Sequence, residues 1–235
     1  MRKLSLLVLA SIFALGGCVN SKQSTSGNEV SPLKYGVFLG ANDTDKEKVA
    51  GFNNAVIDVD EFSSESISYI RNKGTTIYGY LSVGTLENYR SWYDQFKDYT
   101  FMDYENWPNE RWMDISQTRW QNHLFYEASR FFNMGVKGIF MDNFDVYYIA
   151  KEVYEGSDIN AEQIYAACLN ILDGFDQIGL KLIINSGTDL LERMKDEENE
   201  LIDVIDCYCQ ECVFSKIDDY EKDEFSRQDQ EEQDY

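Results

Sequence analysis

Apolar runs that end in polar residues recur along this chain, with helical segments between them, and this alternation limits the possible folds. The expected strands are residues 35–40, 55–60, 76–84, 111–116, 138–143, 181–187 and 202–211. Amphipathic helices are expected over residues 63–74, over 161–178, and over a segment in which Trp120, Leu124, Ala128 and Phe131 recur at helical spacing before Gly135. Strands that alternate with helices are typical of a parallel sheet built from βαβ units.

Two architectures contain such a sheet, the open doubly wound fold and the (β/α)8 barrel. An open sheet usually has a glycine-rich phosphate loop after its first strand, and "YGVFLGANDTDKE" lacks one. Instead, polar residues follow nearly every strand: Asp58, Asp60, Ser82, Glu87, Asp114, Asp142, Asn185 and Glu211. A barrel gathers the carboxyl ends of its strands around one mouth, where these side chains would converge. The pattern therefore favours an α/β fold of the (β/α)8 TIM-barrel type over residues 34–235.

The number of strands falls short of eight. After Phe214 the sequence is polar and acidic, with no apolar run that could form a central strand. We therefore expect a barrel that is truncated after its seventh strand. Such a barrel would have unpaired edges and would be weakly stable.

Carboxylates are the expected catalytic groups. The segment "GIFMDNFDVY" begins as a buried strand and then places Asp142, Asn143 and Asp145 close together, at a cost in solvation and repulsion unless a function uses them. His123 is the single histidine and lies in a helical segment, so histidine-dependent triads are improbable. Asp142 and Glu211 end two strands and could flank a scissile glycosidic bond, as a glycosidase requires.

Several blocks of sequence resemble glycoside hydrolase family 114, which comprises endo-α-1,4-polygalactosaminidase-like (β/α)8 barrels. In family order these blocks are "AVIDVDEF", "YGYLSVGTLENYRSWY", "ERWMDISQTRWQN", "GVKGIFMDNFDVY", "LIINSG" and "IDCYCQECVFSKIDDY". The resemblance covers about residues 35–235. Thr85 departs from it, because the family often has an acid there, so one subsite is expected to differ. The family also continues through an eighth strand.

The resemblance implies an activity and a set of site residues. It implies hydrolysis of an α-1,4-linked galactosamine polymer, with Asp142 and Glu211 as the catalytic acids and no cofactor. The residues that it implies for the substrate cleft are Asp58, Glu87, Tyr89, Arg90, Asn143, Asp145 and Asn185. Aromatic residues that could support sugar rings are Tyr35, Tyr80, Trp92 and Tyr147.

The charge balance of the chain fits a cationic substrate and argues against a nucleic acid partner. The chain has 42 Asp and Glu against 21 Lys and Arg, a formal net charge of -21. This charge would repel nucleic acid phosphates, so we expect no nucleic acid partner. It would attract a cationic amino-sugar polymer, although a solvated acidic surface is the simpler interpretation. The chain is expected to act as a monomer.

The amino-terminal residues have the pattern of an export signal. Arg2 and Lys3 precede a 14-residue apolar stretch that is too short to span a bilayer, and "LGGC" then ends at Cys18. This pattern resembles a bacterial lipoprotein signal, with residues 1–17 removed, Cys18 lipidated and residues 18–33 as a flexible tether. The expected location is extracytoplasmic, anchored to a membrane of the cell envelope through the lipid alone.

Two other functions remain open. One is a catalytically inactive, lipid-anchored protein that binds amino sugars. The other is an enzyme that uses magnesium, held by Asp58 and Asp60 or by Asp142 and Asp145. The remaining cysteines are Cys168, Cys207, Cys209 and Cys212. Their spacing does not match a zinc site, so we expect core or surface thiols.

Overall fold

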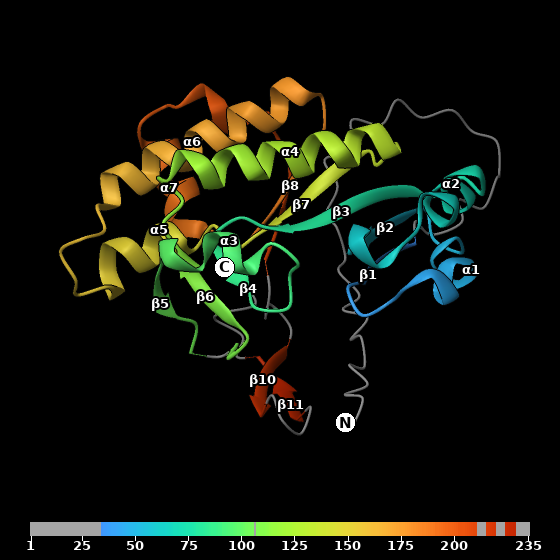
Figure 1. Cartoon of the computed structure of the whole chain (residues 1–235), viewed down its shortest axis with the longest axis horizontal. Coiled ribbons are helices and arrows are strands. Elements are labelled where there is room, and N and C mark those ends of the chain that lie inside the picture. Colours follow the sequence, from blue (N-terminus) through green and yellow to red (C-terminus); the bar gives the residue numbers. More distant parts are fainter. Residues whose placement is uncertain (1–33, 106, 211–214, 220–223, 229–235) are drawn as a thin grey trace, which may run out of the picture. The chain divides into compact units, whose positions relative to one another are not determined.

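The computed structural model of the protein describes residues 34–105, 107–210, 215–219 and 224–228. The strands are β1 (Tyr35–Phe38), β2 (Asn54–Ile57), β3 (Thr76–Ser82), β4 (Thr85–Glu87), β5 (Thr100–Asp103), β6 (Glu110–Met113), β7 (Gly138–Asp142), β8 (Lys181–Asn185), β9 (Ile205–Cys209), β10 (Ser215–Asp219) and β11 (Glu224–Arg227). Figure 1 shows these elements in chain order by colour. Glu211, Cys18 and Cys212 lie outside the described residues, as does the tether.

Helices and helical turns connect the strands. The α-helices are α1 (Lys46–Val49), α2 (Ser64–Asn72), α3 (Tyr93–Phe96), α4 (Thr118–Met134), α5 (Val146–Tyr148), α6 (Ala161–Ile178) and α7 (Thr188–Asp196). The 3-10 turns are η1 (Asp43–Asp45), η2 (Val59–Glu61), η3 (Lys97–Tyr99) and η5 (Glu200–Val204), and η4 (Ile149–Val153) is a π-helical turn. Among the described residues, every helix is too short or too polar to cross a membrane.

Six strands form the main sheet, in the order β1-β2-β3-β7-β8-β9. The pairs β1–β2, β2–β3 and β8–β9 are parallel. This sheet, with helices in its crossovers, confirms the predicted α/β fold of the TIM-barrel type. In the described part of the chain the sheet has fewer strands than a closed barrel of eight, as the sequence predicts.

The prediction for residues 111–116 was wrong in one respect. These residues do contribute to a strand, β6, but β6 belongs to a separate sheet of order β4-β6-β5. Both of its neighbours are antiparallel to it, with Leu86 opposite Arg111 and Thr100 opposite Met113. An alternating apolar pattern identifies a strand but carries no information about its direction or its partner. The parallel sheet therefore contains six of the seven expected strands.

The polar carboxyl-terminal segment contains two strands that the sequence did not predict. β10 and β11 pair with each other in an antiparallel two-stranded sheet of their own. Neither strand joins the six-stranded sheet. This agrees with the expectation that the segment cannot serve as a central strand.

The predicted helices are present in the structure, and capping residues mark their ends. The Ser63 side chain caps α2, which ends before Gly74 in the left-handed region at φ 96°. The Asn160 side chain accepts from two backbone N–H groups at the start of α6, and Gly179 follows its end at φ 87°. The four apolar residues predicted for the inner face of α4 are all buried. These helices confirm the periodicity seen in the sequence.

The described chain divides into two compact units. The first contains residues 34–81 and 127–140, and the second contains residues 82–126 and the described residues after 140. In the first unit, Val56, Ile67 and Ile77 are among the buried core residues. In the second unit, α6 lies beside the first part of α4 (Figure 1), and the ring centroids of Phe125 and Phe175 are 5.9 Å apart.

Candidate active site

Asp142 is a half-buried carboxylate at the carboxyl end of β7, in the second unit. Its Oδ1 accepts a hydrogen bond from the Asn143 peptide N–H at 2.9 Å and another from the Asn185 Nδ2 at 3.0 Å. Asn185 ends β8 and is buried. Hydrogen bonds from N–H donors favour the charged form of a carboxylate. The strand ends therefore hold Asp142 in one orientation as a hydrogen-bond acceptor.

Asn143 turns the chain sharply after β7. Its φ of 64° lies in the left-handed region, which asparagine tolerates better than most residues. The side chain is buried, and its Nδ2 lies 3.0 Å from the Ser82 Oγ and 3.0 Å from the Thr85 Oγ1. The two hydroxyls are 2.7 Å apart. Asn143 thus links the Asp142 carboxylate to the hydroxyl groups at the end of β3 and the start of β4.

A second acid, Glu87, lies buried at the end of β4. It accepts a hydrogen bond from the Tyr89 hydroxyl at 2.5 Å and one from the Arg90 Nε. The Arg90 guanidinium also lies over the rings of Tyr89 and Trp92, at 5.2 and 5.5 Å from their centroids. Tyr89 itself is 63% exposed. An exposed aromatic ring beside a neutralised acid can contact a sugar ring.

A third acid, Glu110, was not among the residues that the sequence pointed to. It lies at the start of β6, directly opposite Glu87, and its Oε2 accepts a hydrogen bond from the Thr85 hydroxyl at 2.6 Å. Burial raises the pKa of Glu110 to about 7, with further increases from the charges of Glu87 and Asp142 and decreases from Thr85 and Arg90. A carboxyl group with a pKa near 7 can carry or release a proton under physiological conditions.

The shifted pKa of Glu110 predicts how stability depends on pH. The folded state keeps its proton up to about pH 7, whereas the unfolded chain loses it near the ordinary value of 4.5. The free energy of unfolding should therefore fall as the pH rises between these values. Glu110→Gln should be more stable than the parent above pH 7, by up to about 3 kcal/mol. Urea unfolding at pH 4.5 and 8 measures this, and an equal difference at both pH values would contradict it.

Residues 20–226 match the family model described as "Glycoside-hydrolase family GH114". The match covers most of the chain. The chain belongs to family GH114. This confirms the resemblance drawn from the ordered sequence blocks.

Two solved structures share the fold of this chain. The glycoside hydrolase domain of PelA from Pseudomonas aeruginosa has a TM-score of 0.68 at 19% identity, with 87% of this chain and 76% of that chain covered. Aspergillus fumigatus Ega3, solved in complex with galactosamine, has a TM-score of 0.61 at 18% identity, with 82% and 73% covered. At these identities the likeness shows a shared fold.

A curated relative, an uncharacterized protein of Thermotoga maritima, is 25% identical over 165 residues. The match covers 65% of this GH114 chain and 51% of the relative. The chain therefore spans about half the length of that relative.

The structure brings most of the predicted cleft residues of this GH114 chain into the second unit. Asp145 precedes α5, and its Oδ1 accepts a hydrogen bond from the Gly187 N–H at 3.1 Å. This bond ties the loop after β7 to the loop after β8, where Ser186 and Gly187 adopt left-handed conformations. Asp145 thus has a structural task besides any contact with substrate.

Two of the predicted residues lie outside the described part of the second unit. Asp58 belongs to the first unit, where it is buried and its Oδ1 accepts from the Asp60 N–H at 3.1 Å. Glu211 lies outside the described residues. Their functional assignments therefore stay predictions.

Some of the aromatic residues that were expected to support sugar rings are buried in the core, and Trp92 lies beside Arg90 of the candidate site. Tyr80 and Tyr147 are buried, and the Tyr147 hydroxyl accepts a hydrogen bond from Arg193, so these two rings are core residues and not sugar platforms. Trp92 is half-buried, packs 4.8 Å from His123 between ring centroids, and lies next to Arg90. His123 also packs against Phe96 at 4.8 Å, as expected for a packed residue.

The cysteines of the described chain, Cys168, Cys207 and Cys209, are not joined in disulfides. Cys168 is buried in α6, as the sequence predicts. A hydrogen bond with Cys209 lowers the pKa of the Cys207 thiol to about 7. Within the described ranges, no group of three His, Cys, Asp or Glu side chains is arranged to hold a metal ion.

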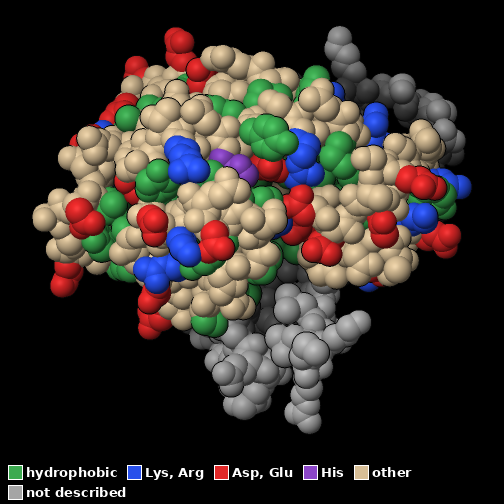
Figure 2. Space-filling view, in the orientation of Figure 1, with side chains coloured by type: hydrophobic (Ala, Val, Ile, Leu, Met, Phe, Trp, Pro, Cys, Tyr) green, Lys and Arg blue, Asp and Glu red, His purple; other side chains and the backbone are tan. Residues whose placement is uncertain are grey.

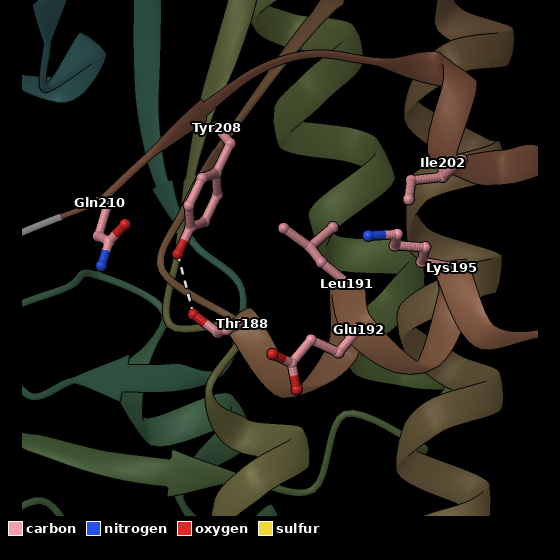
Figure 3. Close-up of a pocket in the computed structure, with 7 residues that line it drawn as sticks. All are labelled: Thr188, Leu191, Glu192, Lys195, Ile202, Tyr208 and Gln210. Atoms are coloured by element: carbon pink, nitrogen blue, oxygen red, sulfur yellow. Dashed lines mark hydrogen bonds between the residues drawn. The ribbon is translucent and has the colours of Figure 1, made fainter. Parts of the chain in front are cut away.

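A shallow groove of about 240 Å³ lies between α7 and β9 in the second unit. Its lining residues are Thr188, Leu191, Glu192, Lys195, Ile202, Tyr208 and Gln210. Figure 3 shows the Tyr208 hydroxyl bonded to Thr188 on one side and the Leu191 and Ile202 side chains on the other. The groove contains none of the acids described above, so we do not assign the reaction to it.

Proposed function

We propose that this GH114 chain hydrolyses α-1,4-linked galactosamine-containing polysaccharide by a two-carboxylate mechanism, with Asp142 and Glu211 as the pair. The observation that carries the proposal is the Asp142 carboxylate, which accepts two N–H donors at the end of β7 in a chain of a glycoside hydrolase family. Because both donors hold it as a hydrogen-bond acceptor, we assign to Asp142 the role of nucleophile or base. Glu211 supplies the proton to the leaving oxygen.

Three further features support an amino-sugar substrate. The half-buried Asp142 carboxylate, when ionised, attracts a cationic sugar. The exposed ring of Tyr89 offers an apolar surface for a pyranose. Ega3, with which the chain shares its fold, was solved with galactosamine. On the face in Figure 2, Asp and Glu side chains are otherwise scattered among Lys and Arg, so the proposal rests on the site and not on an overall acidic patch.

The test is release of reducing ends by the purified chain from a panel of polymers. The panel contains α-1,4-galactosamine polymer, its N-acetylated form, and β-1,4-glucosamine polymer. We expect cleavage of the α-1,4-galactosamine polymer, with and without a chelator. Binding without cleavage would instead indicate an inactive amino-sugar-binding protein, and activity lost with the chelator would indicate a metal-dependent enzyme.

We also propose that the mature chain is anchored to a membrane of the cell envelope through lipid on Cys18. The basic residues, short apolar stretch and small residues before this cysteine support it. Cys18→Ser should remove the acceptor, so the protein should leave the membrane fraction or persist as unprocessed precursor. Cell fractionation and mass measurement check this. A substituted protein that is processed and fractionates like the parent would show the proposal to be wrong.

A further inference from the structure

Two carboxyl groups face each other across the antiparallel pair of β4 and β6. Glu87 and Glu110 are direct partners in the strand register, so their side chains lie on the same face of the small sheet. Like charges at such positions repel, and one must be neutralised or protonated. Arg90 and the Tyr89 hydroxyl neutralise and hydrogen-bond Glu87. Glu110 has a different partner.

That partner is the buried hydroxyl of Thr85. The Thr85 Oγ1 lies 2.6 Å from the Glu110 Oε2 and 3.0 Å from the Asn143 Nδ2. One hydroxyl therefore connects the Glu110 carboxyl to the Asn143 side chain. The Asn143 peptide N–H in turn donates to the Asp142 Oδ1 at 2.9 Å. Glu110 and Asp142 are thus the two ends of one chain of contacts.

We propose that Glu110 is a positioning residue for Asp142: through the Thr85 hydroxyl it orients the Asn143 side chain and so keeps the Asn143 peptide N–H on the Asp142 carboxylate. The inference rests on the proposed function for its kinetic consequences. Its structural part concerns contacts within the second unit alone. Asn143 needs such support, because a residue in the left-handed region is held there by its surroundings.

The protonation of Glu110 reverses the hydrogen bonds in this chain of contacts. When Glu110 is ionised, Thr85 donates to it and accepts from both Ser82 and Asn143. When Glu110 carries its proton on Oε2, it donates to Thr85, and Thr85 turns its own hydrogen towards Ser82, whose oxygen lies 2.7 Å away. Charge on Glu110 also adds repulsion towards Asp142. The protonated form therefore suits an ionised Asp142 better.

Other charged groups lie around Glu110: Glu87 and Asp142 raise its pKa further and Arg90 lowers it, while burial is the largest cause of the shift. The charged or titratable groups on the elements packed around it are Glu87, Tyr89, Arg90, Asp103, Arg111 and Asp142. Arg111 pairs with Asp103 at 2.5 Å, and Arg90 with Glu87. Both arginines thus have a carboxylate other than Glu110. Activity should accordingly decline as the pH rises through about 7, the pKa that burial gives to Glu110.

The kinetic test compares three variants on the α-1,4-galactosamine polymer. Glu110→Ala removes the acceptor of Thr85 and should lower kcat by about 10- to 100-fold with little change in KM. Glu110→Gln retains a hydrogen-bonding group but cannot ionise, so it should recover most of this loss at pH 6 and lack the decline near pH 7. Asp176→Asn, which alters an exposed acid on α6 outside this cluster, is the control and should behave like the parent.

A second measurement separates this inference from the proposed function. The amide resonances of Asn143 should shift with pH around 7 in the parent and stay constant in Glu110→Gln. Hydrogen exchange of the Asn143 peptide N–H should be faster in Glu110→Ala than in the parent or in Glu110→Gln. A parent inactive on every polymer would overturn the proposed function, and the resonances would still decide the positioning role. Superimposable pH titrations of Asn143 in the parent and Glu110→Gln would overturn the inference.

Discussion

Asp142→Asn is expected to lower kcat on the α-1,4-galactosamine polymer on the order of 10³-fold, while the protein still folds. The amide oxygen of asparagine can accept the same two hydrogen bonds that the Asp142 Oδ1 accepts from Asn143 and Asn185. The shape of the loop after β7 is therefore kept. The substitution removes the negative charge, and with it the nucleophile or base and the stabilisation of a positively charged transition state.

The measurement is kcat and KM together with the melting temperature of each variant. Asp176→Asn alters an exposed acid in α6 and should match the parent in all three quantities. Glu211→Gln should lose a similar factor in kcat, because the leaving oxygen would lack its proton donor. Near-parental turnover of Asp142→Asn would remove this residue from the mechanism. If Glu211→Gln alone kept its turnover, Asp142 would need another acid as its partner.

The sequence predicted the parallel strands well because each is a short apolar run ended by polar residues. It failed at residues 111–116, where a run of the same kind forms β6 of the antiparallel sheet. Whether a strand is parallel or antiparallel depends on the strand with which it pairs in the folded protein. The local amino-acid composition does not identify that strand. The pairing of β10 with β11 escaped prediction for a related reason, since the segment is too polar to show a strand pattern.

The sequence likewise predicted some residues of the candidate site and missed one, Glu110. Asp142 and Asn185 were expected to meet because adjacent parallel strands bring their carboxyl ends together, and the structure joins them by a hydrogen bond. Glu87, Tyr89 and Arg90 came from the family resemblance, and they contact one another. Glu110 was missed because the expected strand began at Arg111 and was assigned to the parallel sheet. Only the antiparallel register places Glu110 opposite Glu87.

The surroundings of Thr85 also depend on a residue that is distant in the sequence. From the resemblance alone, its lack of a carboxylate implied an altered subsite. In the structure its hydroxyl contacts the Glu110 carboxyl, which arrives from β6, 25 residues further along the chain. An acid is therefore present beside this position, although a different strand supplies it.

Gly84→Ala is expected to destabilise the protein and to inactivate it at the same time. Gly84 lies between β3 and β4, and its carbonyl accepts from the Met113 N–H of β6 at 2.9 Å. A Cβ atom at this position would lie 1.9 Å from the Asn143 carbonyl oxygen and 2.9 Å from the Val146 Cβ. The first contact involves backbone, which cannot rotate away as a flexible side chain can. Either the loop after β7 or the β3–β4 connection must move by about 1 Å or more.

Such a movement would displace Asn143, whose peptide N–H donates a hydrogen bond to the Asp142 carboxylate. The proposed catalytic carboxylate would therefore move as well. We expect a loss of about 3 kcal/mol or more in the free energy of unfolding, and a melting temperature lower by roughly 10 °C. Among molecules that stay folded, kcat should fall by about 100-fold. Gly51→Ala is the matched control, because the nearest atom to its added Cβ is the Lys48 carbonyl oxygen at 3.2 Å. Parental stability and turnover in Gly84→Ala would show that the close approach of Gly84 to Asn143 does not position Asp142.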